Sequence, residues 1–317
     1  MPTSAHESLA SLTTEQQNLA SQALDTKSAL EIATIINRED AKVAAAVSKA
    51  LPEIALAIDM VTESLKRGGR LIYVGTGTSG RVAALDATEC PPTFSVDPQR
   101  VRFVIAGGEK ALGRAVEADE DSAELGQRDL AKLRPSKKDV VVGIAASGRT
   151  PYTIAAVEHA RNKGARTVAV SCNPDTALTR AADIAITAEV GPEVLSGSTR
   201  MKAGTAQKMI LNMITTGAMT RLGYVYGNLM VNVSLKNTKL FERAITILST
   251  AAGVDREQAS EALTQSGRSV PIALIMLKTG ISRTQAKRQL RASSGNVRRA
   301  IQSSGSASSS GTRASAE

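Results

Sequence analysis

Short apolar runs alternate with helix-length segments through the middle of the chain. Runs that are apolar at nearly every position and only four to six residues long are typical of strands buried on both faces of a parallel sheet. The pattern therefore predicts an α/β fold, a three-layer sandwich with a five-stranded parallel sheet between helices. The predicted strands are Leu71–Val74, Val101–Ala106, Val140–Ala145, Thr167–Ser171 and Ile184–Thr187.

Helical periodicity precedes and follows this region. Residues 27–68 predict a helical N-terminal arm in three pieces, broken near Asn37 and at Pro52. A long helix is predicted at about Met201 to Met219, and a small C-terminal helical bundle follows it. We therefore expect a domain over residues 1–252 that includes the arm, a three-helix bundle over 253–302 and a disordered Ser-rich tail over 303–317. The bundle helices are predicted near Arg256–Gln265, Val270–Lys278 and Arg283–Ala292.

Composition limits the chemistry that the chain can perform. The only two cysteines, Cys90 and Cys172, are too few for a disulfide framework, and both are expected to be small buried residues. The two histidines, His6 and His159, provide almost no material for a histidine-based triad or a multi-histidine metal site. Acid and base catalysis would then depend on carboxylates or lysine. With neither an export signal nor a long apolar run, we predict a cytoplasmic protein.

The net charge of +9 is concentrated toward the C-terminus. Residues 253–317 contain ten Lys or Arg and four Asp or Glu, and 10 minus 4 gives +6 of that charge. Without aromatic or zinc-finger features, a solvated basic face is the favoured interpretation over binding of nucleic acid or a membrane.

Three turns rich in hydroxyl residues follow predicted strands. They contain Thr76–Ser79, Ala146–Thr150 and Gly197–Lys202. The carboxyl ends of parallel strands meet at one edge of the sheet, where α/β folds bind their ligands. The three turns are therefore expected to face one crevice.

The first turn matches the spacing of a dinucleotide fingerprint, G-x-G-x-x-G, from Gly75 to Gly80. That fingerprint requires an acidic residue at the end of the second strand, where this chain has Ala106-Gly-Gly108. Hydroxyls and helix N-terminal amides instead suit one phosphate monoester, with helix capping as the alternative explanation for any single turn. The candidate phosphate ligands on this reasoning are Thr78, Ser79, Ser147 and Thr150.

Two acidic positions are candidates for catalysis. Glu89 stands at the expected end of the helix after the first turn, where Pro91 and Pro92 should force the chain to turn. A carboxylate is disfavoured at a helix C-terminus, which weakly indicates a function, although such residues are usually exposed. Glu120 lies in the acidic stretch 117–121, and from spacing alone a solvated acidic face is equally consistent.

At these residues the chain resembles the N-acetylmuramic acid 6-phosphate etherases of the sugar isomerase (SIS) domain superfamily, from Leu12 to about Ile301. The small departures are Thr88, where the family usually has Ser, and Ala118-Asp119, where it has Gly-Ala. The C-terminal helices look like the family's small bundle, which is similar to ubiquitin-associated domains. The resemblance is carried by GTGTSGRVAALDATECPPTF, IAGGEKALGRAVEADEDS, VVVGIAASGRTPY and GSTRMKAGTAQKMILNM.

The resemblance implies an SIS-type fold and cleavage of the D-lactyl ether of N-acetylmuramic acid 6-phosphate during cell-wall recycling. It implies neither a metal nor an organic cofactor. The proton donor of the family falls on Glu89, and a second catalytic glutamate falls on Glu120. We expect Glu120 to act as the base and Glu89 as an acid that burial keeps protonated. The substrate-binding residues are predicted to be Gly77, Thr78, Ser79, Ser147, Gly148, Arg149, Thr150, Glu117, Ser198 and Lys202.

Two other functions share parts of this pattern. A sugar-phosphate isomerase would use the same phosphate turns and the same proton abstraction, but it needs no acid aimed at an ether oxygen. A non-catalytic sensor would resemble the glucokinase regulatory protein, which carries two SIS units in one chain. This chain supplies one unit, so we expect a homodimer to make the pair.

Overall fold

The computed structural model describes residues 12–114, 119–235 and 238–308. The chain forms two compact units. The first contains Met1–Thr88 and Pro98–Thr215, and the second contains Glu89–Asp97 and Thr216–Glu317. Helices α4 (Gly77–Phe94) and α8 (Lys202–Leu222) each contribute residues to both units.

The first unit contains the predicted five-stranded parallel sheet, in the order β2-β1-β3-β4-β5. Every strand overlaps its predicted range, so the α/β fold read from the apolar runs is confirmed. The order reverses between β1 and β3, which pair with Gly75 opposite Ile144. This is the position at which α/β sheets place a ligand crevice. The strands are β1 (Leu71–Gly75), β2 (Val101–Ile105), β3 (Val140–Ile144), β4 (Arg166–Ser171) and β5 (Ile184–Thr187).

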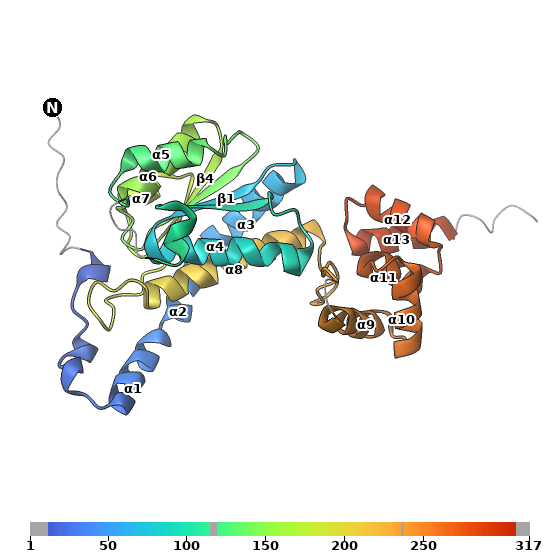
Figure 1. Cartoon of the computed structure of the whole chain (residues 1–317), viewed down its shortest axis with the longest axis horizontal. Coiled ribbons are helices and arrows are strands. Elements are labelled where there is room, and N and C mark those ends of the chain that lie inside the picture. Colours follow the sequence, from blue (N-terminus) through green and yellow to red (C-terminus); the bar gives the residue numbers. More distant parts are fainter. Residues whose placement is uncertain (1–11, 115–118, 236–237, 309–317) are drawn as a thin grey trace, which may run out of the picture. The chain divides into compact units, whose positions relative to one another are not determined.

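Helices cover both faces of this sheet because its central strands are buried along their whole length. Helices α5 (Ala123–Ala131), α6 (Pro151–Asn162) and α7 (Ala177–Ala181) cover one face, where Tyr152 and Leu130 pack on Ile72 and Val141. Helix α3 (Leu51–Lys66) packs on β1, β3 and β5. In Figure 1, α4 and α8 lie on the side of the sheet away from α5.

The N-terminal arm is helical, as predicted. It consists of the short turns η2 (Thr13–Glu15), η3 (Leu19–Ser21) and η4 (Leu24–Thr26), followed by α1 (Ala29–Asp40), α2 (Val43–Ser48) and α3. A capping box formed by Ser28 and Glu31 begins α1. Pro52 lies in the first turn of α3, where a missing backbone N–H costs nothing, so this proline begins a helix.

Helix α4 differs from the prediction that Pro91 and Pro92 end it. The helix continues through both prolines to Phe94, and the N–H of Ser95 then donates to the Pro91 carbonyl at 2.9 Å. Prolines near a helix end remove only a few of its hydrogen bonds, so the last turn persists. Glu89 consequently lies inside α4, five residues before its end.

The second unit is built around the apolar faces of α9 (Thr238–Ala252), α10 (Arg256–Gln265), α11 (Val270–Thr279), α12 (Arg283–Ala292) and α13 (Val297–Ser308). The three helices predicted for this region are confirmed by α10, α11 and α12. Helix α9 belongs to the same core, through Ile245 and Leu248, although the expected boundary separated it from the bundle. Helix α13 begins in that core, where Val297 and Ala300 are buried, and continues to Ser308, inside the segment expected to be a disordered tail.

Within the residues that the structure describes, no helix is both long enough and apolar enough to cross a membrane.

Candidate functional site

The turn from β1 into α4 requires glycine at three positions. A Cβ on Gly75 would lie 3.0 Å from the Gly80 amide nitrogen, and one on Gly80 would lie 2.5 Å from Cγ1 of Ile105. Gly77 has a φ of +46°, a backbone conformation that side-chain-bearing residues rarely adopt. The three glycines therefore allow the helix to start directly after the end of the strand, where its first backbone N–H groups have no partner within the helix.

The turn from β3 into α6 is similarly constrained. Gly148 has a φ of +68°, and a Cβ there would lie 2.2 Å from Oγ1 of Thr176. Thr150 occupies the N-cap position of α6, but its hydroxyl makes no capping hydrogen bond. Ser147 Oγ accepts from the Arg149 N–H at 3.2 Å. Capping alone therefore does not explain Thr150, which is free to serve a ligand.

These two turns are neighbours, because β1 and β3 pair in the sheet. The starts of α4 and α6 thus lie side by side at the switch point, each with backbone N–H groups that favour an anion. Thr78 and Ser79 lie in the first turn of α4, and Ser79 is buried. The structure brings together four predicted phosphate ligands, Thr78, Ser79, Ser147 and Thr150, at this edge.

Glu120 lies between the same two helix starts. A Cβ on Gly77 would be 3.2 Å from Oε1 of Glu120, and the Glu120 carbonyl accepts from the Tyr152 N–H at 3.2 Å. The side chain is partly buried. Helix N-termini stabilise a carboxylate, and a base must be ionised to accept a proton. The position therefore suits Glu120 as a general base.

The third predicted turn does not present a free helix N-terminus. The Glu193 carboxylate accepts from the backbone N–H groups of Lys202 at 3.0 Å and Ala203 at 2.9 Å, so it occupies the start of α8. The Lys202 ammonium forms an ion pair with Glu39 at 2.7 Å, and its side chain is 2% exposed. In the structure Lys202 is thus a buried partner of Glu39. Ser198 is partly buried on the loop before α8.

Glu89 is exposed on this chain. Along α4 it lies 12 residues after Gly77, which corresponds to roughly 18 Å of helix rise. We expected Glu89 to be buried, but no part of its own chain that the structure describes covers it. Glu117 lies outside the described residues.

One buried acid of α4 itself was not singled out from the sequence. Asp86 is 5% exposed and accepts hydrogen bonds from the Tyr73 hydroxyl at 2.8 Å, the Asn212 amide at 2.7 Å and the Thr215 hydroxyl at 3.1 Å. Burial raises the pKa of the Asp86 carboxyl, and these hydrogen bonds only partly oppose the rise. The carboxyl ties α4 to β1 and α8. Only the tertiary structure reveals it, because Asp86 stands in the sequence as one polar residue on an amphipathic helix.

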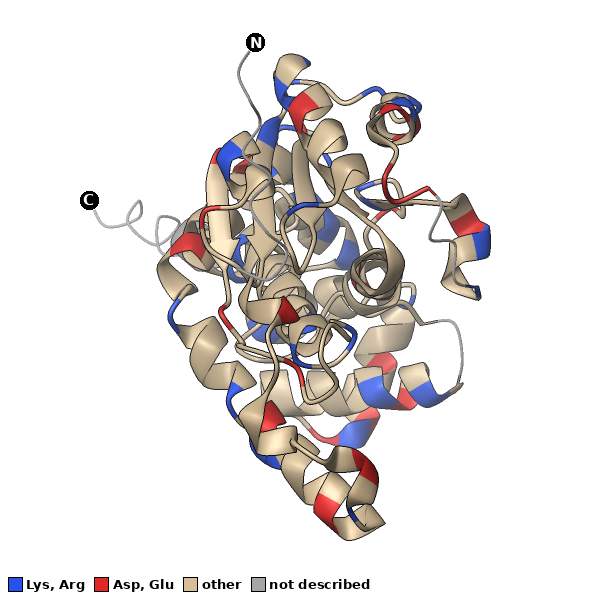
Figure 2. Cartoon of the chain, turned by 90° about the vertical axis from the view of Figure 1, so that its left-hand side faces the viewer, with Lys and Arg blue, Asp and Glu red and all other residues tan. Residues whose placement is uncertain are grey.

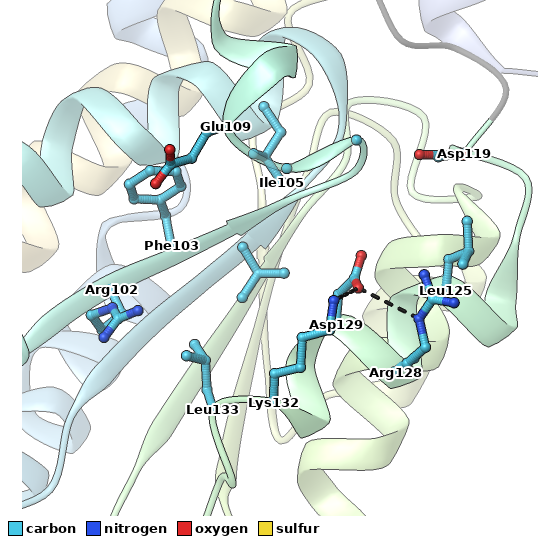
Figure 3. A pocket seen from close by; sticks show the side chains of 13 residues that line it. Arg102, Phe103, Ile105, Glu109, Asp119, Leu125, Arg128, Asp129, Lys132 and Leu133 are labelled. Atoms are coloured by element: carbon cyan, nitrogen blue, oxygen red, sulfur yellow. Dashed lines mark hydrogen bonds and ion pairs between the residues drawn. The ribbon is translucent and has the colours of Figure 1, made fainter.

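A cavity of about 680 Å³ lies beside the edge strand β2 (Figure 3). Its wall includes Asp129, which forms ion pairs with Lys132 at 2.8 Å and with Arg128 at 3.8 Å. Asp119, next to Glu120 in the chain, reaches its rim. Of the predicted site residues that the structure describes, none lines this cavity, so the candidate site is the β1–β3 edge.

Known proteins resemble this chain over nearly its whole length. Three family models match in succession: the glucokinase regulatory protein N-terminal SIS domain over residues 53–161, the SIS domain over 115–217, and the C-terminal lid domain of glucokinase regulatory protein over 227–269. An N-acetylmuramic acid 6-phosphate etherase of Edwardsiella ictaluri is 53% identical over 92% of this chain and 98% of its own length. The chain belongs to the N-acetylmuramic acid 6-phosphate etherase family.

Other members of the etherase family match at about the same level. Etherase 1 of Bacillus licheniformis is 50% identical over 92% of this chain and 96% of its own length. The Pasteurella multocida etherase is 50% identical over 95% of this chain and 99% of its own length. A solved phosphoheptose isomerase from Francisella tularensis has a TM-score of 0.50 at 18% identity, and covers 61% of this chain and 100% of its own. The family and the SIS-type fold inferred from the four sequence segments are thus confirmed.

Proposed function

We propose that this chain is a lyase that cleaves the D-lactyl ether of N-acetylmuramic acid 6-phosphate, giving N-acetylglucosamine 6-phosphate and D-lactate in peptidoglycan recycling. Its relatives carry the name of this activity at 50–53% identity. The structural observation that carries the proposal is the Glu120 carboxylate beside Gly77, at the start of two helices. A base in that position can act on a sugar whose phosphate binds the neighbouring amides.

The chemistry requires two protonatable groups. In the ring-opened sugar, the lactyl ether oxygen is attached to carbon 3, which is beta to the aldehyde. Glu120 removes the proton from carbon 2, the bond from carbon 3 to oxygen breaks, and Glu89 gives its proton to the departing lactate oxygen. Water then adds to the unsaturated aldehyde, placing a hydroxyl on carbon 3 and a proton on carbon 2. No electrons leave or enter the site.

The phosphate is held in this proposal by the starts of α4 and α6. Thr78 and Ser79 on one side and Ser147 and Thr150 on the other supply hydroxyl donors in addition to backbone amides. Gly77 and Gly148 are needed for backbone reasons, since both have positive φ. The other predicted contacts, Arg149, Ser198 and Lys202, remain proposals, and Lys202 would have to act beside its ion pair with Glu39.

We further propose that the active form is a homodimer in which Glu89 reaches the partner subunit's Glu120. Glu89 is exposed, and Leu85, one turn earlier on α4, is 50% exposed. A second copy covering this stripe would remove apolar surface from water and would desolvate the Glu89 carboxyl, which favours its protonated form. The helix rise of roughly 18 Å from Gly77 to Glu89 makes a donor from a second copy the simpler arrangement.

We place this reaction in the cytoplasm. Cys90 and Cys172 are both buried and form no disulfide, which suits a reducing compartment.

The experiment measures two steps separately on purified protein. N-acetylmuramic acid 6-phosphate is incubated in deuterated water, and D-lactate release and deuterium uptake at carbon 2 are followed. We expect Glu89→Gln to slow lactate release by about 10²- to 10⁴-fold while exchange continues, and Glu120→Gln to stop both. Glu124→Gln, an exposed acid on α5, is the matched control and should behave as wild type.

The rivals give different results. A sugar-phosphate isomerase would produce a ketose without lactate, and a sensor would bind the substrate without consuming it. Unchanged lactate release in Glu89→Gln would remove this residue from the mechanism. Retained exchange in Glu120→Gln would contradict its role as the base.

A further inference from the structure

Residues 13–18 cross three turns at the carboxyl edge of the sheet. They contact the turn after β4 and the loop between β5 and α8, and Asn173 of the turn after β4 bonds in addition to the turn after β3. We call residues 13–18 together with Glu39 the N-terminal tie. This segment precedes the SIS domain matches, which begin at residue 53.

The first connection runs through Asn173, which is 1% exposed. Its Oδ1 accepts from the Thr13 N–H at 3.0 Å and the Thr13 hydroxyl at 2.8 Å. Its amide nitrogen donates to Thr14 Oγ1 at 3.1 Å and to the Ala146 carbonyl at 3.0 Å. The Asn173 side chain thus makes all four hydrogen bonds that its amide allows, two as acceptor and two as donor. Its partner Ala146 immediately precedes Ser147 in the proposed phosphate turn.

The second connection joins the arm to the loop before α8. Asn18 donates from one amide nitrogen to Glu39 Oε2 at 2.9 Å and to the Pro192 carbonyl at 3.0 Å. Glu39 Oε2 also accepts from the Lys202 ammonium at 2.7 Å. Acidic and basic residues both occur along the helices of the arm (Figure 2), but the side chains of Glu39 and Lys202 are only 5% and 2% exposed.

Burying a charge pair costs desolvation free energy, which is offset only when the pair has good geometry and further hydrogen bonds. Removing one partner should therefore destabilise the packing of the elements that the pair joins. Burial opposes ionisation of Glu39, but hydrogen bonds from Lys202, Lys42 and Asn18 outweigh it and lower its pKa to about 2. Glu39 is therefore charged at neutral pH and remains paired with Lys202. Neither side chain is available to a ligand without breaking this pair.

We infer that the N-terminal tie is a positioning element of the site: through Asn173 and through the Glu39–Lys202 pair it fixes the two turns that carry Ser147 and Ser198. This inference rests on the proposed function, which supplies both the assay substrate and the site roles of Ser147 and Ser198. Its residues act through the turns and do not touch the sugar phosphate. Loss of the tie should weaken binding equally in the ground state and the transition state, which raises KM and leaves kcat nearly unchanged.

The test uses Thr14→Val, which removes the hydroxyl acceptor of Asn173 but keeps the side-chain shape. We expect KM for N-acetylmuramic acid 6-phosphate to rise roughly 10-fold, with kcat within about 2-fold of wild type. Hydrogen exchange should become faster at the amides of residues 146–150. Thr26→Val is the matched control, since the Thr26 hydroxyl bonds only to the nearby Ala23 carbonyl on the exposed arm, and it should change neither quantity.

A double-mutant cycle separates positioning from direct contact by Lys202. If Lys202 acts through Glu39, then Lys202→Met and Glu39→Gln each raise KM, and the double variant is little worse than either single one. If Lys202 binds phosphate directly, only Lys202→Met causes a large loss and the two effects add. The double variant removes both buried charges, so it keeps the cycle measurable if one single variant folds poorly.

Two outcomes overturn the inference: a Thr14→Val enzyme with wild-type KM and unchanged exchange at 146–150, or additive effects in the cycle. Failure of the proposed function gives a different result, because the wild-type protein would then release no lactate. In that case hydrogen exchange in Thr14→Val still tests whether the tie fixes the turn.

Discussion

Mixing two inactive variants tests whether the catalytic pair is shared between subunits. Glu89→Gln and Glu120→Gln are each expected to lose about 10²- to 10⁴-fold in lactate release. Glu89 lies 12 residues, or roughly 18 Å of helix rise, beyond Gly77, whereas Glu120 approaches Gly77 itself. If Glu89 serves the partner subunit's site, a heterodimer of the two variants contains one site with both glutamates and one site with neither.

The recovered activity can be calculated from random pairing. An equimolar mixture forms about half heterodimers, each with one of its two sites intact, so lactate release should return to about one quarter of wild type. The variants are combined under mild denaturation and dialysed, and D-lactate is assayed after gel filtration confirms subunit exchange. A mixture of exchanged dimers that stays at the level of the separate variants would refute the shared site, because a site formed within one chain always lacks one glutamate.

Three further predictions concern the geometry of the edge and its charges. Gly77→Ala places a Cβ 3.2 Å from Oε1 of Glu120 at a φ of +46°, so kcat for lactate release should fall roughly 10-fold while the melting temperature drops by only a few degrees; an unchanged kcat would show that the carboxylate tolerates displacement. Gly148→Ala meets Thr176 Oγ1 at 2.2 Å, so the dissociation constant for N-acetylglucosamine 6-phosphate, measured by calorimetry, should rise by at least about 10-fold. The pKa of Glu39 is about 2 against an ordinary 4.5, so its contribution to stability is present above pH 4.5 and is lost as the pH falls toward 2. The free energy of unfolding, measured by urea denaturation, should therefore change by about 3 kcal/mol less between pH 4.5 and 2 in Glu39→Gln than in wild type. If the free energy of unfolding depends on pH equally in both proteins, the lowered pKa of Glu39 is contradicted.

The sheet and most helices could be predicted because their signals are local. A strand buried on both faces needs an apolar residue at nearly every position. That pattern is visible in the sequence itself at Leu71–Val74 and Val140–Ala145. The hydroxyl-rich turns are visible for a similar reason, since a chain that must start a helix directly after a strand shows glycine and small polar residues there. The prediction that Pro91 and Pro92 end the helix was wrong, because a proline in the last turn removes few of the helix's hydrogen bonds.

For the candidate site, too, local features could be predicted and long-range contacts could not. The sequence by itself determined which residue types could act: two glutamates, hydroxyls and glycines at fixed spacings, and a resemblance that identified the family. Only the tertiary structure decided which of them meet. It placed Glu120 beside Gly77, left Glu89 exposed, and engaged Lys202 with Glu39, a residue 163 positions earlier in the chain. Spacing along a chain fixes local backbone geometry, whereas the pairing of distant charges depends on how helices pack, which no local pattern contains.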